Sequence, residues 1–333
     1  MNCNLPHVSP ILPVWSDFVV IRARVLMPRS VLAVDLGGTN VRMAAVDPSG
    51  VVQHLVRRST PAGVTGEQLA ELLAEMAAEC SAAISGGFSA ISIGVPANVT
   101  SSGVVHRLPN IPGLEGADLG SLVSKRLGIP VVLENDATAA AIGERWLGAS
   151  KGIDNSILIT LGTGVGGGII VNGEPLRGPD GGAGKLGHVC VEPDGHSCGC
   201  GSHGCIEQYA SATAMVRMAN EAGLQVANSR ELYEKWRAGD ERAKQVFDSV
   251  GYHLGITLAG LVNTFNPDII IMGGGAAAAW DAFIKPLTAE LMARAFKEPA
   301  ERAKVVRTML GDDAGILGAA RSAFDLVHEA HQQ

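Results

Sequence analysis

Cysteine and histidine, residues that readily bind transition metals, gather in one stretch of this chain. CVEPDGHSCGCGSHGCIEQY, from Cys190 to Tyr209, holds four of the six cysteines. Thiols this close together either bind a metal or, in an oxidising compartment, form disulfides. Residues 1–26 have neither a basic start nor a small-residue cleavage site after a clean apolar run, so we expect no signal peptide. We therefore expect the protein in the reducing cytoplasm. A metal site is the preferred interpretation, with disulfides as the alternative.

Two other stretches place glycine and threonine between apolar runs. VLAVDLGGTNVRMAAVD (31–47) and SILITLGTGVGGGIIVNG (156–173) both read as strand, turn and strand. A turn that wraps a phosphate brings backbone N–H groups within about 3 Å of its oxygens, and a Cβ obstructs that approach. The residues suited to this role are Gly37, Gly38, Thr39, Gly162, Thr163, Gly164 and Gly166. Asp35, at the end of the first strand, can hold Mg²⁺ through water.

Other phosphate-binding motifs fit less well. GTGVGGG contains a GxGxxG pattern, but the dinucleotide fingerprint opens a helix, and here IIVNG predicts a second strand. The GK[ST] ending of a P-loop is absent from the sequence. A third glycine turn, IMGGGAAAAW (271–280), lies between a predicted strand and a predicted helix, where a flat base can lie against backbone. An ordinary tight turn is the alternative at each place.

A carboxylate follows another predicted strand. IPVVLENDATAAAIGE places Asn135 and Asp136 after the strand Val131 to Leu133, where a helix begins. Asp136 is either the N-cap of that helix or a general base that takes a proton from a substrate hydroxyl during phosphoryl transfer. Asn135, and Asn110 in the loop LPNIPGL, can both donate and accept hydrogen bonds, which suits sugar hydroxyls.

These residues need a scaffold of buried strands and covering helices. Apolar spacing over 65–80 predicts an amphipathic helix that begins with a capping box. YHLGITLAGLVNTF (252–265) predicts a helix, and PDIIIMGGG after it predicts a buried strand. The alternation predicts an α/β protein with two similar lobes and a cleft between them. We place the small lobe at 30–138 and the large lobe at 139–315, and expect the C-terminal helix at 316–333 to pack on the small lobe.

Composition limits the partners. The chain of 333 residues is 47% hydrophobic and 18% charged, with a formal net charge of −7. An acidic chain does not suit nucleic acid as the main partner, because neutralising phosphates requires clustered Lys and Arg. No run of about 18 uninterrupted apolar residues predicts a membrane span. We expect residues 1–29 to form a poorly ordered extension.

Eight motifs together resemble the ROK family of repressors and sugar kinases. They are DLGGTNVR, LPNIPG, ENDATAAAIGE, LGTGVGGG, GHVCVEPDG, CGCGSHGCIEQ, IIMGGG and GDDAGILGAA, in the order of the family. The resemblance covers about residue 31 to the end. It implies an actin-like (ribonuclease H-like), two-lobed ATPase and sugar kinase fold. Members with these kinase motifs phosphorylate a hexose at its 6-hydroxyl, with ATP and Mg²⁺.

The resemblance also implies roles for residues of this chain. Asp136 is the base. The nucleotide and its Mg²⁺ are held by Asp35, Gly37, Gly38, Thr39, Asn40, Thr163, Gly164, Gly274 and Gly275. The sugar is contacted by Asn110, Asn135, Asp136, Lys185, His188 and Glu207. Structural Zn²⁺ is bound by His188, Cys198, Cys200 and Cys205, in a loop spanning 188–207. The remaining cysteine of that loop region, Cys190, is expected in a buried strand. We expect a homodimer or homotetramer.

One residue departs from the family pattern. Kinases of the family carry glutamate three residues before the zinc histidine, whereas GAGKLGH has Lys185 there. Lysine donates hydrogen bonds and accepts none, so the identity of the sugar and the efficiency of catalysis both stay open. The alternatives are an N-acetylglucosamine or N-acetylmannosamine kinase, polyphosphate in place of ATP, a sugar-binding protein of reduced activity, and a repressor. For the repressor, the 34 residues before Asp35 show no helix-turn-helix pattern.

Overall fold

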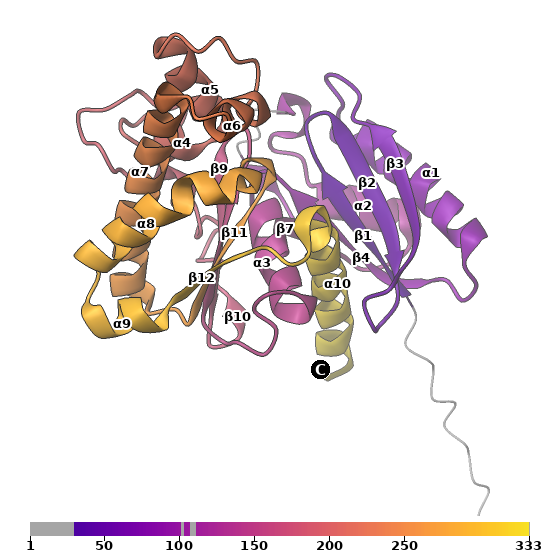
Figure 1. The fold of residues 1–333 in the computed structure, drawn as a ribbon. Helices are drawn as coiled ribbons and strands as arrows, with labels where there is room; N and C mark the ends of the chain where they lie inside the picture. Colours follow the sequence, from indigo (N-terminus) through magenta and orange to yellow (C-terminus); the bar gives the residue numbers. More distant parts are fainter. Residues whose placement is uncertain (1–29, 101–102, 107–110, 333) are drawn as a thin grey trace, which may run out of the picture.

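The structure is a computed structural model that describes residues 30–100, 103–106 and 111–332. The expected extension at 1–29 and the expected sugar contact Asn110 lie outside these ranges. Two lobes stand side by side, each built on a five-stranded sheet (Figure 1). The division of the chain at 138/139 and 315/316 stays a prediction.

The first sheet has the strand order β3-β2-β1-β4-β7. Its strands are β1 (Ser30–Leu36), β2 (Asn40–Val46), β3 (Val52–Ser59), β4 (Phe88–Val95) and β7 (Val131–Asn135). The first three strands are antiparallel neighbours, whereas β1, β4 and β7 run parallel. Side chains alternate across a strand, so Leu32 and Val34 of β1 join the core under the helix α1 (Gly66–Ala83). Val31 and Ala33 face the other side, where α10 (Ala314–Gln332) packs.

The second sheet repeats this plan with the order β10-β9-β8-β11-β12. Its strands are β8 (Ser156–Leu161), β9 (Val165–Val171), β10 (Glu174–Pro175), β11 (Ile269–Gly273) and β12 (Lys304–Arg307). β8 and β9 form an antiparallel hairpin, and β8, β11 and β12 run parallel. The main core of this lobe lies between the sheet and the long helix α7 (Glu241–Phe265), around Phe247 and Phe283.

Two helices join the lobes. α3 (Asp136–Leu147) follows β7 of the first sheet and packs on β8 and β9 of the second, while α10 packs on β1 and β4. The two helices lie against each other in the middle of the molecule (Figure 1). A Cβ on Gly318 would lie 1.6 Å from the carbonyl oxygen of Ala139, and one on Gly143 would lie 2.2 Å from that of Ala314. Only glycine permits so close a contact of the helices.

The remaining elements surround the sheets. They are β5 (Asn98–Val99), β6 (Val105–His106), η1 (Pro112–Leu114), α2 (Leu119–Leu127), η2 (Leu186–His188), α4 (Glu207–Ala210), α5 (Ala212–Glu221), α6 (Ser229–Arg237), η3 (Gly275–Ala279), α8 (Trp280–Arg294), α9 (Lys297–Arg302) and η4 (Gly311–Asp313). Among the helices that the structure describes, none has the length and hydropathy needed to span a membrane.

Several local predictions are confirmed. α1 begins with the predicted capping box, in which Thr65 and Gln68 bond each other's backbone N–H groups. The predicted helix at 252–265 is the second half of α7, and the buried strand after it is β11. The prediction for Cys190 is wrong, because the residue is exposed and forms only an isolated bridge with Cys205. Within the described residues, the bridge between Cys190 and Cys205 is isolated and is not extended into a sheet.

Candidate active site and metal cluster

The first glycine turn joins β1 to β2. The N–H of Gly37 donates to the carbonyl of Asn40 over 2.8 Å, and the Thr60 hydroxyl donates to the carbonyl of Gly37 over 2.7 Å. Gly38, Thr39 and Asn40 are exposed at the tip. Hydrogen bonds to the carbonyls of Gly37 and Asn40 thus close the turn. Its tip is exposed, as a turn that binds phosphate requires.

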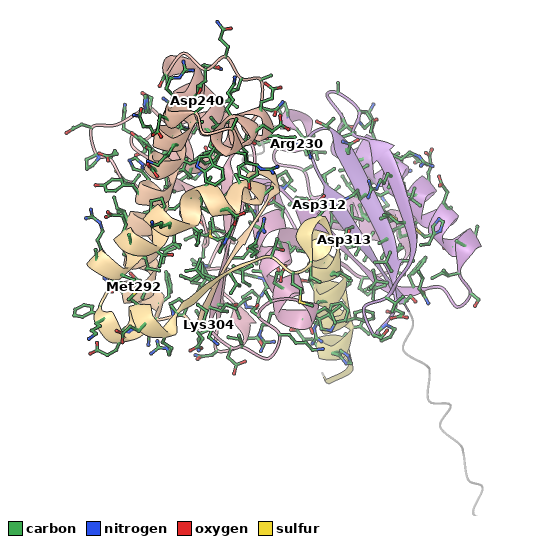
Figure 2. All side chains as sticks on the ribbon, in the orientation of Figure 1. Arg230, Asp240, Met292, Lys304, Asp312 and Asp313 are labelled. Atoms are coloured by element: carbon green, nitrogen blue, oxygen red, sulfur yellow. The ribbon has the colours of Figure 1, made fainter. Side chains whose placement is uncertain are left out.

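Asp35 lies at the base of this turn and is held by Arg42. Arg42 donates to one carboxylate oxygen of Asp35 through Nε at 3.1 Å and Nη2 at 2.6 Å. The same Nη2 donates to the carbonyl of Asp312 over 2.6 Å, and Nη1 lies 3.7 Å from the carboxylate of Asp313. Asp312 and Asp313 stand at the border of the lobes, just before α10 (Figure 2). Arg42 therefore fixes the predicted Mg²⁺ carboxylate and leaves its other oxygen without a bond to Arg42.

The second glycine turn joins β8 to β9 in the same way. The N–H of Gly162 donates to the carbonyl of Gly164 over 2.9 Å, and Thr163 is exposed at the tip. The third turn abuts it: Gly274 has φ +83°, and a Cβ there would lie 2.5 Å from the carbonyl oxygen of Leu161. Gly274 and Gly275 are exposed. The second and third turns therefore form one continuous glycine-lined surface.

Asp136 is the first residue of α3, at the carboxyl end of β7. The N-cap is its neighbour Asn135, whose side-chain oxygen accepts from the N–H of Thr138 over 3.2 Å. The alternative of Asp136 as the N-cap is therefore wrong. One oxygen of Asp136 accepts from the N–H of Ala137 at 2.8 Å and from the amide of Asn135 at 3.1 Å. The carboxylate is thus oriented by its own helix start, and its second oxygen accepts no hydrogen bond within the part of the chain that the structure describes.

Two charged neighbours of opposite sign affect the pKa of Asp136. Burial raises the pKa of this carboxyl above its ordinary value, and Asp35 adds to the rise. The backbone N–H of Ala137, the ammonium of Lys185 and the amide of Asn135 act against it. These through-space influences indicate that Asp35 and Lys185 lie near Asp136. A raised carboxyl pKa is typical of catalytic acids and bases in clefts.

Lys185 stands where the family resemblance leads us to expect glutamate. It is half-buried and forms no side-chain hydrogen bond or ion pair with any residue that the structure describes. Burial lowers the pKa of its ammonium, and Asp136 counters this. The segment is fixed by its neighbours, because Leu186 packs where a Cβ on Gly167 would stand and Gly187 lies directly against the carbonyl of Val165. The backbone directly after Lys185 is therefore held against β9.

The four residues predicted to bind zinc lie together. The ligand atoms of His188, Cys198, Cys200 and Cys205 all lie within 4.8 Å of one another. The Sγ atoms of Cys200 and Cys205 are 3.6 Å apart, and Cys198 Sγ lies 3.6 Å from His188 Nδ1. Tetrahedral Zn²⁺ would place such atoms about 3.5–3.8 Å apart, given Zn–S and Zn–N bonds of about 2.3 and 2.0 Å. The cluster therefore fits Zn²⁺ with no open position, and Nε2 of His188 stays available.

Disulfides are not formed among the cysteines that the structure describes, all of which are free. Burial and then the thiols of Cys200 and Cys198 raise the pKa of Cys205 to about 12. A bound divalent cation would instead lower the pKa of these thiols, because it binds the thiolates and neutralises their mutual repulsion. The chemistry of the four side chains therefore agrees with their spacing.

Glu207 links the metal cluster to the second glycine turn. One of its oxygens accepts from the N–H of Val165 over 3.0 Å, and the other lies 4.0 Å from Cys198 Sγ. A Cβ on Gly164 would meet the Glu207 carboxylate at 2.3 Å. The predicted sugar contacts that the structure describes thus lie in two groups: Asn135 and Asp136 at the start of α3, and Lys185, His188 and Glu207 against β9.

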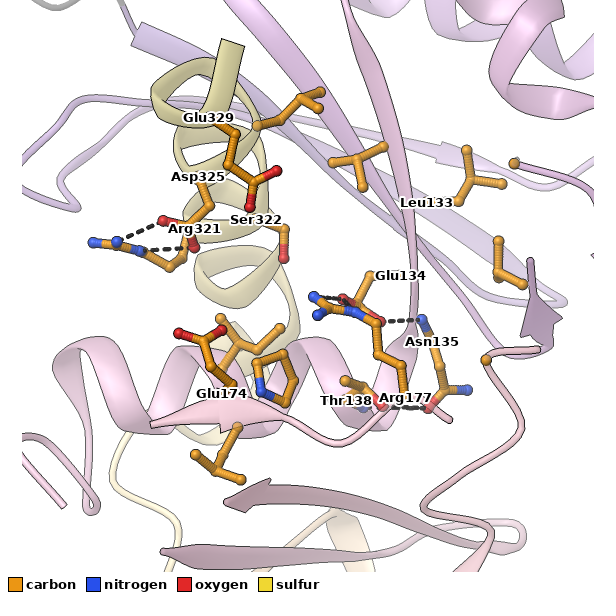
Figure 3. Close-up of a pocket in the computed structure, with 18 of the residues that line it drawn as sticks. Leu133, Glu134, Asn135, Thr138, Glu174, Arg177, Arg321, Ser322, Asp325 and Glu329 are labelled. Atoms are coloured by element: carbon orange, nitrogen blue, oxygen red, sulfur yellow. Dashed lines mark hydrogen bonds and ion pairs between the residues drawn. The ribbon is translucent and has the colours of Figure 1, made fainter. Parts of the chain in front are cut away.

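Sequence reasoning missed two buried carboxylates. Glu134 is 4% exposed and pairs with Arg177 over 2.6 Å, which connects β7 to the loop after β10. This pair lies in a cavity of about 950 Å³ bounded by β7, α3, α10 and that loop (Figure 3). Glu144, fully buried in α3, accepts from the N–H groups of Leu310 at 2.9 Å and Ala149 at 2.6 Å. The only local signal is an apolar stretch directly before Glu134 and a mostly apolar helix around Glu144.

Comparison with known proteins agrees with this arrangement. The model of the ROK family matches residues 31–326. Glucokinase of Thermotoga maritima is 36% identical over 312 residues, which cover 88% of this chain and 97% of that protein.

Two crystal structures resemble the whole fold. ROK hexokinase from Thermus thermophilus is 36% identical with a TM-score of 0.80, covering 90% of this chain and 99% of that one. A ROK family glucokinase from Streptomyces griseus, in complex with glucose and AMPPNP, is 35% identical with a TM-score of 0.75, covering 89% and 99%. The predicted actin-like, two-lobed fold is therefore confirmed, and this chain belongs to the ROK family.

Proposed function

We propose that this protein is an ATP-dependent hexose kinase that phosphorylates the 6-hydroxyl, as a glucokinase does. The observation that carries the proposal is the position of Asp136, a carboxylate with a raised pKa at a strand end, in the neighbourhood of Asp35. Similarity to proteins named glucokinase over nearly their whole length supports it.

The chemistry follows from these positions. Asp136 accepts the proton of the sugar hydroxyl as that oxygen bonds to the terminal phosphorus of the donor, and ADP leaves. The turns at 37–39, 162–164 and 274–275 present backbone N–H groups to the phosphates. Asp35 would hold Mg²⁺ through water, with Arg42 fixing the carboxylate. When bound, Mg²⁺ neutralises charge that develops on the phosphates.

For the sugar we propose contacts from both groups of side chains. Asn135 and Asp136 approach it from α3, and Lys185, His188 and Glu207 from the loop beside β9. Asn110, which lies outside the described residues, completes the proposed set. Bound Zn²⁺ would hold His188 through Nδ1, so that Nε2 donates to or accepts from a hydroxyl.

A panel assay tests the proposal. Purified protein is supplied with Mg²⁺–ATP and one sugar at a time, from hexoses and N-acetylhexosamines, and ADP release is coupled to NADH oxidation. We expect sugar-dependent ADP release with a hexose, and ³¹P NMR of the product should show a 6-phosphate. Faster turnover of an N-acetylhexosamine would make that sugar the substrate in place of a hexose. Polyphosphate releases no ADP, so reactions with it as the donor are followed by ³¹P NMR of the sugar phosphate. Absence of a sugar phosphate with every sugar and both donors would contradict a kinase.

Lys185 favours a second candidate, a family member with reduced activity towards neutral hexoses. A hydroxyl that would donate to a glutamate there loses a charge-assisted hydrogen bond, worth about 1.5–3 kcal/mol, or roughly 10–150-fold in kcat/KM. Lys185→Glu should then raise kcat/KM for a neutral hexose at least about tenfold, with little change in KM for ATP. A change within about twofold would show that position 185 is not a working sugar contact.

A further inference from the structure

The second glycine turn is held from behind by the residues that follow the metal loop. The N–H of Ala212 donates to the carbonyl of Gly162 over 2.8 Å, and the Thr213 hydroxyl donates to the carbonyl of Thr163 over 2.8 Å. Both donors belong to the first turn of α5, which begins seven residues after Cys205.

These two bonds fix the direction of the turn's own donors. In a trans peptide the C=O and the following N–H point to opposite sides, and the described chain has no cis bond. Because the carbonyls of Gly162 and Thr163 point to α5, the N–H groups of Thr163 and Gly164 point away from it. Neither N–H donates to another group in the described structure. The start of α5 therefore aims two free donors at the side where a phosphate would bind.

Val165, at the end of the same turn, is held by neighbours of two metal ligands. Its carbonyl lies against Gly187, where a Cβ would approach to 2.1 Å, and Gly187 precedes His188. Its N–H donates to Glu207, two residues after Cys205. The other Glu207 oxygen lies 4.0 Å from Cys198 Sγ. One ion bound by both His188 and Cys205 would thus fix the two segments that contact Val165.

We propose that the metal cluster and the second glycine turn form one coupled unit, so that bound metal and bound nucleotide stabilise each other. Glu207 and Thr213 are the positioning residues of this unit. The proposal rests on the proposed function, since it takes the turn at 162–164 as the site of the donor's phosphates. Coupling between two sites is reciprocal, and typical values correspond to about 5–150-fold in affinity.

The affinities for zinc and for nucleotide measure this coupling on the full chain. Zinc-loaded protein is titrated to equilibrium with a competing colorimetric chelator, with and without saturating Mg²⁺–ADP, which gives the Kd for zinc in each case. Calorimetry gives the Kd of Mg²⁺–ADP before and after zinc removal. We expect ADP to lower the Kd for zinc at least about fivefold, and zinc removal to raise the Kd of Mg²⁺–ADP by the same factor. If circular dichroism shows that the zinc-free protein has lost its fold, the Kd for zinc with and without ADP decides the test.

Thr213→Val separates coupling from general stability. It removes one hydroxyl on an exposed helical turn, so it should keep about one zinc per chain and weaken ADP binding about fivefold, the effect of one hydrogen bond. Thr288→Val removes a hydroxyl that donates to the Ile284 carbonyl in α8, away from the turn, and should leave the Kd unchanged.

The outcomes that would overturn the proposal differ from those that would overturn the proposed function. If the wild type binds Mg²⁺–ADP with the same Kd with and without zinc, or ADP leaves the Kd for zinc unchanged, the coupling is wrong and a kinase is still possible. Equal ADP affinity of Thr213→Val and wild type removes Thr213 from its positioning role. If ADP binds to neither metal state, the proposed function fails together with the coupling.

Discussion

Lys185 and Asp136 carry opposite charges that influence each other's pKa, and no ion pair within 4.0 Å joins them. The ammonium lowers the pKa of the Asp136 carboxyl, while burial and Asp35 raise it. A general base must be ionised before it accepts a proton. If Asp136 is the general base, as we propose, the charge of Lys185 therefore favours the ionised form that accepts the proton.

Neutralising Lys185 should make the activity more sensitive to acid. Lys185→Met removes the charge that lowers the pKa of Asp136, so this pKa rises and the acid limb of kcat/KM against pH moves to higher pH. Lys185→Arg keeps the charge and should keep the limb. Lys297→Met, on the exposed helix α9, is the control for loss of a positive charge elsewhere. An unchanged limb in Lys185→Met would remove Lys185 from the surroundings of the base.

Elemental analysis should find about one zinc per chain, because one His and three Cys form a closed tetrahedral set. Cys198→Ala should lose most of the metal and lower the melting temperature, since metal binding is coupled to the folding of the loop. Cys190→Ser is the matched control, because Cys190 is exposed and lies outside the cluster. Zinc-free protein with oxidised cysteines would restore the disulfide interpretation.

The ion pair of Glu134 and Arg177 should stabilise the protein measurably. Removing one partner of a buried pair leaves an unpaired buried charge and costs about 3–5 kcal/mol. Arg177→Met should lie near the lower end, because the Arg177 side chain is 47% exposed while Glu134 is 5% exposed. Arg321→Met, in a pair exposed on both sides at 41% and 43%, should cost about 1 kcal/mol or less. Urea unfolding of both variants gives the comparison, and equal costs would contradict the role of burial.

Local pattern was sufficient for the hairpins and the glycine turns, and the family resemblance supplied the metal ligands. In each case the chemistry and the chain geometry lie within about twenty residues, as in the capping box of α1 or the loop from His188 to Cys205. The contacts that hold the site are long-range and leave no such pattern. Glu207 and Val165 are separated by 42 positions and Glu134 and Arg177 by 43. Only the packing of β9 against α3 and the metal loop brings these partners together.

The wrong predictions have local causes as well. Val189 to Val191 has the composition of a strand, but the folded loop provides only the single bridge from Cys190 to Cys205. Asp136 is a residue type typical of an N-cap, but α3 begins one residue earlier than that role needs, and Asn135 is the N-cap. For Asp136, one residue in the start of the helix decided the outcome.

The Asp136→Asn variant should also differ from the wild type in thermal stability. Burial raises the pKa of Asp136 in the folded state, so the stability that its protonated form contributes is present below the ordinary pKa and lost as pH rises through the raised value. At pH 7 the ionised carboxylate therefore destabilises the fold. The asparagine variant should melt at the same or a higher temperature than wild type. This is the result expected if Asp136 serves catalysis at the expense of stability.

The central claim is that Asp136 is the general base of a sugar kinase, and turnover of Asp136→Asn with the preferred sugar tests it most directly. Asparagine keeps the size and the hydrogen bonds to Ala137 and Asn135 but cannot take the proton. General base catalysis contributes about 10²–10⁴-fold, so we predict a fall in kcat of that order with the Kd for Mg²⁺–ADP unchanged. A variant that binds ADP normally and turns over at nearly the wild-type rate would contradict the claim.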